Sequence, residues 1–121
     1  MKVLVPTAGL GPAKKNAEYI LEIARKLKAE VMVIHITDPL ESDVDQAALD
    51  EFAEWGEKKD VPVSSKIIEG NIVPTIVDYA LDNQVNLIIM GASKGRIVAE
   101  WVVAQVMEKC SAPVVIIPYQ Y

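Results

Sequence analysis

Apolar residues follow two alternating patterns along the chain. Short runs rich in valine and isoleucine are typical of buried strands, and the stretches between them carry apolar residues every three or four positions, as an amphipathic helix does. The runs predict strands over residues 2–6, 30–36, 61–68, 86–90 and 114–117. The periodic stretches predict helices over residues 13–28, 41–59, from Asn71 onward, and about 96–109.

The alternation of strands and helices determines the type of sheet. Strands that are separated by helices cannot pair as tight hairpins, so they form a parallel sheet with both faces covered. We therefore expect an α/β fold with a doubly wound five-stranded parallel sheet and helices on both faces. Pro62 lacks the N–H that a central strand donates, which places the third strand at an edge. Ligands of such sheets bind beyond the carboxyl ends of the strands, here the loops 7–12, 37–42, 69–72 and 91–96.

Each predicted helix has an apolar face, and several have a boundary signal. The apolar positions of the first three helices are Ala17, Ile20, Leu21, Ala24 and Leu27, then Leu49, Phe52, Ala53 and Trp55, then Ile76, Val77, Ala80 and Leu81. Gly9–Pro12 predicts a turn before the first helix. Asn71 is a capping residue for the third helix, with Pro74 in its first turn. Asp43 and Asp45 begin the second helix, where they suit the positive end of the helix dipole.

The composition narrows the classes of partner. The 121 residues carry a formal net charge of −5, so the basic face that non-specific nucleic-acid binding requires is not expected. No apolar run approaches the roughly 18 residues of a membrane span, and the run after Met1 is too short for a signal peptide. The single cysteine, Cys110, fits a reducing compartment. We expect one cytoplasmic domain over residues 1–121, with no nucleic-acid partner and no membrane partner.

The motifs of common catalytic and cofactor sites are missing from the predicted loops. Gly9 and Gly11 form only the first half of a dinucleotide-binding motif, and the chain has no P-loop sequence. His35 lies inside a predicted strand, where a hydrogen-bonded core or rim histidine is expected. Asp43, Asp45 and Asp50 lack the spacing, the glycine and the closing glutamate of a cation-binding loop. The sequence predicts neither a metal site nor a catalytic constellation, and an enzyme is not expected.

The order and spacing of several segments resemble the universal stress protein A-like family over nearly the whole chain. The opening KVLVPTAG…AEYILEIARKLKAEVMVIHITDP is similar to that family's first strand, first helix and second strand, with a His-x-x-Asp-Pro ending at His35, Asp38 and Pro39. EGNIVPTIVDYALDNQVNLIIMG resembles its third helix and fourth strand, and CSAPVVIIP resembles its last strand. The resemblance implies the universal-stress/adenine nucleotide alpha hydrolase-like fold, with strand order 3-2-1-4-5.

Many members of that family bind ATP through a G-x₂-G-x₉-G-[ST] motif and an acidic residue after the first strand, and this chain departs from both. Ala8 stands where an aspartate is typical, and Gly91 and Gly95 are separated by three residues. The family's Gly-[Ser/Thr] falls on Glu100 and Trp101, where a carboxylate repels phosphate and an indole fills the space that a close backbone approach needs. We therefore expect no usual ATP site, although the short turn that ends at Gly95 is able to hold one anion.

A remodelled nucleotide site is the alternative that the resemblance implies. In that hypothesis ATP or AMP binds with its nucleoside near the end of the first strand, its base against two apolar side chains and its phosphates at the glycine turn. The candidate residues are, in that order, Thr7 and Ala8, then Ile36 and Met90, then Gly91, Ser93, Lys94, Gly95 and Arg96. A weak ATPase or phosphotransferase is the least favoured alternative, because the carboxylates and hydroxyls that it needs are missing.

Two features predict self-association. Between Ile97 and Met107 only Glu100 and Gln105 are polar, so the last helix is apolar nearly all round. The last strand, PVVIIP, is an apolar sheet edge that invites pairing with another chain, unless the two C-terminal tyrosines cover it. Members of the resembled family dimerise through this strand. The candidate interface residues are Trp101, Pro113, Val114, Val115, Ile116 and Ile117. We expect a homodimeric regulatory or interaction module, whose regulatory partner the sequence does not identify.

Overall fold

The computed structural model describes residues 1–7, 10–37, 46–91 and 97–118 of the chain. Within these residues strands and helices alternate without exception. The elements are, in order, β1 (Lys2–Thr7), α1 (Leu10–Leu27), β2 (Glu30–Thr37), α2 (Gln46–Lys59), β3 (Val63–Glu69), α3 (Ile72–Asp82), β4 (Leu87–Gly91), α4 (Ile97–Lys109) and β5 (Val114–Ile117). The predicted alternation of elements is confirmed.

The five strands form one parallel sheet in the order β3-β2-β1-β4-β5. This order confirms the prediction, and it places β3, which follows Pro62, at one edge and β5 at the other. β1 lies in the middle because its apolar core, Val3–Val5, is almost completely buried on both faces. The chain moves outward in one direction from β1 to β3 and in the opposite direction from β4 to β5, so the strand order reverses between β1 and β4.

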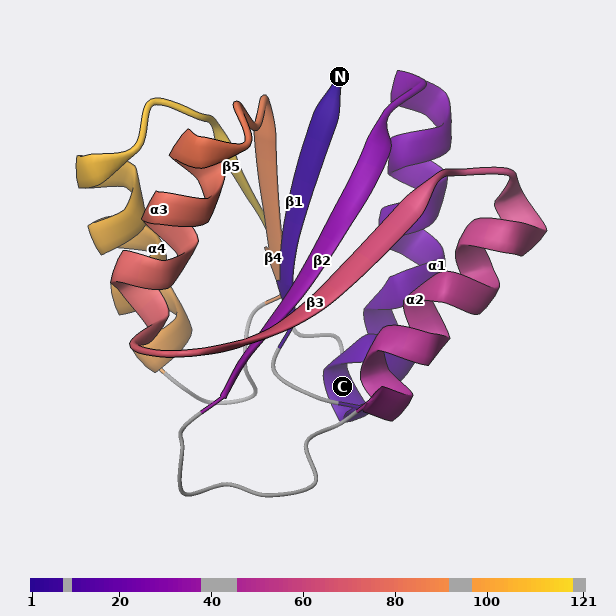
Figure 1. The fold of residues 1–121 in the computed structure, drawn as a ribbon, viewed down its shortest axis with the longest axis horizontal. Helices are drawn as coiled ribbons and strands as arrows, with labels where there is room; N and C mark the ends of the chain where they lie inside the picture. Colours follow the sequence, from indigo (N-terminus) through magenta and orange to yellow (C-terminus); the bar gives the residue numbers. More distant parts are fainter. Residues whose placement is uncertain (8–9, 38–45, 92–96, 119–121) are drawn as a thin grey trace.

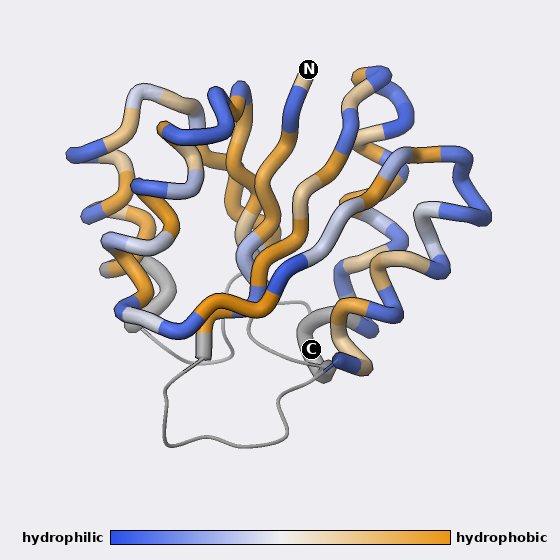
Figure 2. The backbone as a smooth tube through the Cα atoms, in the orientation of Figure 1, coloured by the Kyte–Doolittle hydropathy of each residue, from blue (hydrophilic) through white to orange (hydrophobic). Residues whose placement is uncertain are grey.

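Two helix layers cover the sheet, with α1 and α2 on one face and α3 and α4 on the other (Figure 1). Because successive strand residues point to opposite faces, Val3 and Val5 pack toward α1 and α2, whereas Leu4 packs toward α3 and α4. The strands β1, β2, β4 and β5 are apolar along most of their length, β3 carries several polar residues, and polar residues recur along the helices (Figure 2). We call the two buried groups the α1/α2 cluster and the α3/α4 cluster.

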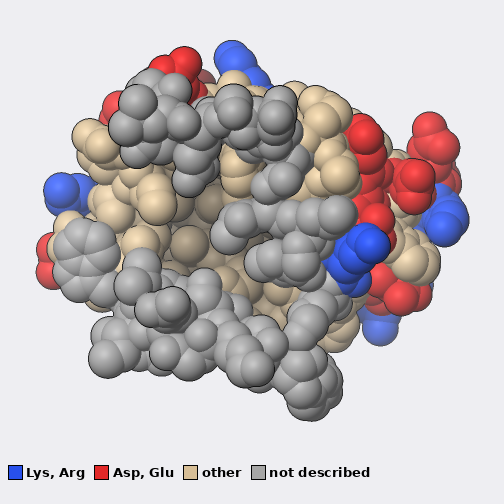
Figure 3. Space-filling view, turned by 90° about the horizontal axis from the view of Figure 1, so that it is seen from below, with Lys and Arg blue, Asp and Glu red and all other residues tan. Residues whose placement is uncertain are grey.

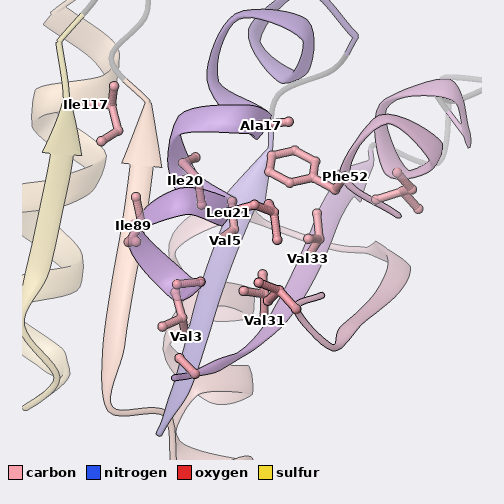
Figure 4. Packing of buried hydrophobic residues seen from close by; sticks show 14 of the residues in the cluster. Val3, Val5, Ala17, Ile20, Leu21, Val31, Val33, Phe52, Ile89 and Ile117 are labelled. Carbon is pink, nitrogen blue, oxygen red and sulfur yellow. The ribbon is translucent and has the colours of Figure 1, made fainter. Parts of the chain in front are cut away.

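Phe52 is among the largest fully buried side chains of the α1/α2 cluster. It extends from α2 toward the sheet, close to Ala17 of α1 and Val33 of β2 (Figure 4). On the opposite side of α1, Ile20 approaches Ile89 of β4 (Figure 4). These contacts fix where the middle of α1 lies, above the middle of β2 and β4.

Several local predictions were wrong, each for a physical reason. The predicted turn Gly9–Pro12 is helical from Leu10 onward, because a proline in the first turn of a helix loses no hydrogen bond. Leu27 is exposed because α1 ends there, and Ala29 takes the next buried position. Leu81 is exposed because the neighbouring Ala80 faces the core, about 100° away around the helix.

Two further predictions about helix faces and caps also need correction. Ala53 is exposed, whereas Leu49 and Phe52 of the same helix are buried as expected. Asn71 occupies the N-cap position of α3, but its side chain makes no capping hydrogen bond. The acidic residues expected at the start of the second helix, Asp43 and Asp45, lie outside the described residues.

Candidate functional site

The candidate site lies at the carboxyl ends of β1 and β4, where the strand order reverses. Ligands of open α/β sheets bind at such a point because the loops that follow the two strands diverge there. Viewed from this end, the surface at the centre carries no charged side chains among the described residues, and acidic and basic groups gather at the side of α1 and α2 (Figure 3).

Pro6 limits the pairing between the two central strands. The Glu30 N–H donates to the Met1 carbonyl and the Asn86 N–H donates to the Lys2 carbonyl, so odd residues of β1 bond to the β2 side and even residues to the β4 side. Pro6 is the even residue after Leu4, and it has no N–H to donate. Accordingly the β1–β4 ladder stops at Leu4 and Ile88, whereas the β1–β2 ladder continues to Thr7 and His35.

His35 fastens the end of β1 to β2. The residue is 6% exposed, and Nδ1 of its ring lies 3.0 Å from the carbonyl oxygen of Thr7. A carbonyl only accepts, so Nδ1 carries the proton and donates it, and in the neutral ring Nε2 is then an acceptor. The expectation of a buried, hydrogen-bonded histidine is confirmed, and this bond holds the last described residue before the β1–α1 loop in place.

The predicted base-contacting residues lie together on one face of the sheet. Met90 is buried in the α3/α4 cluster, and the half-buried Ile36 packs against the same cluster. Thr7 and Gly91 end β1 and β4, so these predicted residues also lie at the carboxyl end. The other predicted members of this site lie outside the described residues: Ala8, Ser93, Lys94, Gly95 and Arg96.

Asn16 lies beside the end of β4, and the sequence reasoning did not identify this neighbour of the candidate site. It is half-buried on α1, and a Cβ atom placed on Gly91 would lie only 2.5 Å from its Nδ2 atom. A side chain at position 91 would therefore require the terminal amide of Asn16 to move aside. A signal existed in the sequence: Asn16 lies one helical turn before the buried Ile20 and beside the buried Ala17, on an otherwise apolar face.

The sequence of this chain matches a known protein family. Residues 1–118 match the model of the Universal stress protein family. The chain belongs to the universal stress protein family. A universal stress protein of Methanocaldococcus jannaschii is 25% identical over 137 residues, which cover 96% of this chain and 81% of that protein. The resemblance inferred from the sequence segments is confirmed.

Solved structures of universal stress proteins share the fold. One, in complex with cAMP, has a TM-score of 0.80 and 18% identity, with 99% of this chain and 98% of that chain covered. An Arabidopsis thaliana family member with AMP bound has a TM-score of 0.75, 17% identity and coverages of 99% and 92%. A third, from Archaeoglobus fulgidus in complex with dAMP, has a TM-score of 0.65, 20% identity and 96% coverage of both chains.

The last strand of this universal stress protein is a sheet edge with apolar exposed residues. Val115 is 39% exposed and Ile116 is 41% exposed, although both are large apolar side chains. Pro113 is exposed and Val114 is half-buried. Ile117 differs from the other predicted interface residues, because it is buried in the α1/α2 cluster of its own chain. The side chain of Trp101 lies outside the described residues.

Other features of the described residues concern metal binding, the single cysteine and membrane insertion. No group of three or more His, Cys, Asp and Glu side chains is arranged to hold a metal ion among the residues searched there. Cys110 is half-buried and packs against the α3/α4 cluster. Among the described helices, none combines the length and the apolar character that crossing a bilayer requires.

Proposed function

We propose that this universal stress protein is a homodimeric regulatory module that assembles through β5. The observation that carries the proposal is the exposed apolar edge formed by Val115 and Ile116. An edge strand presents unpaired backbone groups, and apolar side chains beside them favour pairing with another chain. A two-fold axis would place β5 antiparallel to the β5 of the partner and join the two sheets, with the same surface used on both chains.

The oligomeric state tests this proposal directly. We expect sedimentation velocity to show a dimer at micromolar concentration and the double variant Val115→Glu/Ile116→Lys to be monomeric, because charged side chains at an edge strand oppose pairing. Met107→Glu is the matched control, since Met107 is also a large exposed apolar residue but lies on α4. A monomeric wild-type protein would overturn the proposal. Equal dissociation by Met107→Glu would show that another surface is used.

A second function is the binding of a nucleoside monophosphate. It is favoured by the early end of the hydrogen bonding between β1 and β4 at Pro6, because the two strand ends separate beyond that point. Beyond that point the strand ends present the apolar Ile36 and Met90 beside Thr7 and Gly91. Three structural relatives hold cAMP, AMP or dAMP, each a nucleoside with one phosphate. Because the chain departs from the family's ATP motif at Ala8, Glu100 and Trp101, a single phosphate fits this sequence better than a triphosphate.

A ligand series separates this function from the first. Thermal unfolding would be measured with adenosine, AMP, cAMP and ATP, with and without magnesium. We expect AMP or cAMP to stabilise the protein, by about 2.7 kcal/mol at a concentration 100 times the Kd, and ATP to stabilise it no more than AMP. No saturable effect of any nucleotide would overturn the nucleotide proposal and leave the dimer proposal intact. Tighter binding of ATP would show that the usual triphosphate site survives.

A further inference from the structure

The two edges of the sheet differ in the side chains that they present to solvent. β3 follows Pro62 and exposes Ser64 and Lys66, and a charged side chain on an edge strand opposes pairing with another chain. β5, in contrast, consists only of valine and isoleucine, and Val115 and Ile116 are 39% and 41% exposed. Of the two edges, β5 therefore has the composition of a strand that pairs with a further strand.

The hydrogen bonds between β4 and β5 determine which backbone groups of β5 point away from the sheet. The Ile88 N–H donates to the Pro113 carbonyl at 2.9 Å, and Ile88 is the partner of Val114 in the parallel ladder. In such a ladder the residues before and after Val114 bond to β4, so the odd residues of β5 direct their backbone groups inward. The N–H and C=O groups of Val114 and Ile116 consequently point outward, toward the place of a sixth strand.

Pro118 limits how a second β5 can pair with this edge. It is the next residue after Ile116 whose backbone would point outward, and it has no N–H to donate. A register that placed Val114 opposite the partner's Pro118 would leave the Val114 C=O without a donor. The opposite shift would pair Ile116 with the partner's Ala112, which precedes β5. Pairing Val114 with the partner's Ile116 instead uses the N–H and C=O groups of both residues.

We propose that β5 pairs with the β5 of a second copy in this one register, so that Val115 lies opposite the partner's Val115 on the two-fold axis. The register rests on the homodimer proposed above and names the residues that meet in it. Side chains directly opposite each other in an antiparallel pair share one face of the sheet. The two Val115 side chains meet on the α1/α2 face, as Ile117 two residues later also faces that cluster. On the α3/α4 face, Ile116 meets the partner's Val114.

The register fixes three distances between equivalent residues of the two chains. Val115 and the partner's Val115 form a pair that exchanges no hydrogen bonds, for which the Cα atoms are about 4.5 Å apart. The two copies of Val114 are diagonal neighbours, as are the two copies of Ile116, with separations of about 7–8 Å. A disulfide requires Cα atoms about 4.4–6.8 Å apart, so a cysteine at position 115 is close enough to its own copy and the other two are not.

Single cysteines measure the register. Each would be introduced with Cys110→Ala, which removes the native thiol, and oxidised glutathione would serve as the oxidant. We expect Val115→Cys to form a covalent dimer about tenfold faster than Val114→Cys or Ile116→Cys, as followed by non-reducing electrophoresis. The last two are matched controls, because they lie on the same strand next to position 115.

A charge exchange tests the same contact without oxidation. Like charges directly opposite each other repel, and opposite charges attract. We expect an equimolar mixture of Val115→Glu and Val115→Lys to dimerise about tenfold more tightly than either variant alone, as measured by sedimentation velocity. A mixture that associates no more tightly than the separate variants would overturn the direct contact between the two Val115 side chains.

The cross-linking outcomes separate the register from the dimer itself. A monomeric wild-type protein would overturn both. A dimeric wild type in which Val114→Cys or Ile116→Cys cross-links fastest would overturn only the register, because these residues face their own copies in the two shifted pairings. A dimeric wild type in which none of the three positions cross-links would overturn both, since β5 would not be the interface.

Discussion

At the scale of single residues, Gly56 allows α2 to lie directly against the start of β3. A Cβ atom at position 56 would lie 2.5 Å from Cγ2 of Val63 and 3.0 Å from the carbonyl oxygen of Val61. Neither neighbour can move easily, because valine is β-branched and the carbonyl belongs to the backbone. The Gly56 carbonyl also accepts a hydrogen bond from the Val61 N–H, at 2.9 Å. Glycine at this position therefore allows α2 and β3 to pack closely, although glycine is less favourable than alanine inside a helix.

Replacing Gly56 tests that balance. Alanine is favoured over glycine inside a helix by about 1 kcal/mol, but overpacking a closed contact costs about 1–3 kcal/mol. We expect Gly56→Ala to lower the free energy of unfolding by about 1–2 kcal/mol, measured by urea denaturation. Ala53→Gly on the exposed side of the same helix is the control, and it should cost about 1 kcal/mol through propensity alone. A stabilised Gly56→Ala variant would contradict the tight contact.

Residue patterns predicted the fold better than they predicted the site. The buried faces of α1 and α3 followed from periodicity, except at two positions. Leu27 is exposed because α1 ends there, and Leu81 is exposed because Ala80 faces the core instead. Asn16 was missed because only apolar residues were assigned to the inward face of this helix, although Asn16 lies one turn before Ile20 on that face. Its contact with Gly91 joins residues from two distant elements, and only the three-dimensional arrangement brings them together.

At the scale of elements, α1, α2 and α3 end in the same way. A residue with a left-handed backbone lies just beyond each end: Lys28 (φ 55°) and Asp60 (φ 58°) directly follow α1 and α2, and Gln84 (φ 53°) follows the C-cap Asn83 of α3. The N–H of the next residue bonds back to the carbonyl of the residue five positions earlier, as Ala29 does to Ala24 at 3.0 Å. This arrangement is the Schellman motif, in which glycine is the usual left-handed residue. None of these three positions is glycine, so the turns carry backbone strain.

Glycine at the end of α1 should relieve that strain. A left-handed conformation costs an ordinary residue about 1–2 kcal/mol, and the greater chain entropy of glycine in the unfolded state offsets part of the gain. We expect Lys28→Gly to raise the free energy of unfolding by about 0.5–1 kcal/mol in urea denaturation. Lys26→Gly, inside the last turn of the same helix, should instead lower it by about 1 kcal/mol. Destabilisation by both variants would show that Lys28 makes contacts worth more than its strain.

A carboxylate on α1 connects that helix to α2. Glu22 accepts hydrogen bonds from Arg25 on its own helix and from Lys59 of α2, whose Nζ lies 3.2 Å from Oε2. The hydrogen bond from Arg25, and then that from Lys59, lowers the pKa of Glu22 from 4.5 to about 2. Because the carboxylate stays in contact with solvent, dissolved salt weakens this connection.

The lowered pKa of Glu22 makes the α1–α2 connection sensitive to acid. A carboxyl group with a depressed folded-state pKa stabilises the fold above its unfolded value of 4.5, and this stabilisation is lost as the pH falls toward 2. We expect Glu22→Gln to have a lower melting temperature than the wild type near neutral pH, with the difference disappearing toward pH 2. High salt should shrink the difference at neutral pH. A difference that does not change with pH would mean that packing, rather than charge, is lost in the variant.

At the scale of the whole molecule, the two buried clusters share one sheet. Every central strand contributes alternate side chains to both, as Val3 and Leu4 of β1 do. The parallel order was predictable because helices separate all the strands, and right-handed crossovers leave few arrangements. What the sequence could not specify was the partner of the exposed β5 edge, because residues 113–117 have the same pattern whether they meet solvent or a second chain.

Because the clusters are joined through the strands, damage to either should unfold both. Ile20 of the α1/α2 cluster and Ile76 of the α3/α4 cluster are almost completely buried. We expect Ile20→Ala and Ile76→Ala each to lower the free energy of unfolding by about 2–5 kcal/mol. Both should keep one calorimetric transition and an unchanged dependence on urea, since a single cooperative unit exposes the same surface. Ile72→Ala on the exposed side of α3 is the control and should change stability little. Two separated transitions in either core variant would show that the helix layers unfold independently.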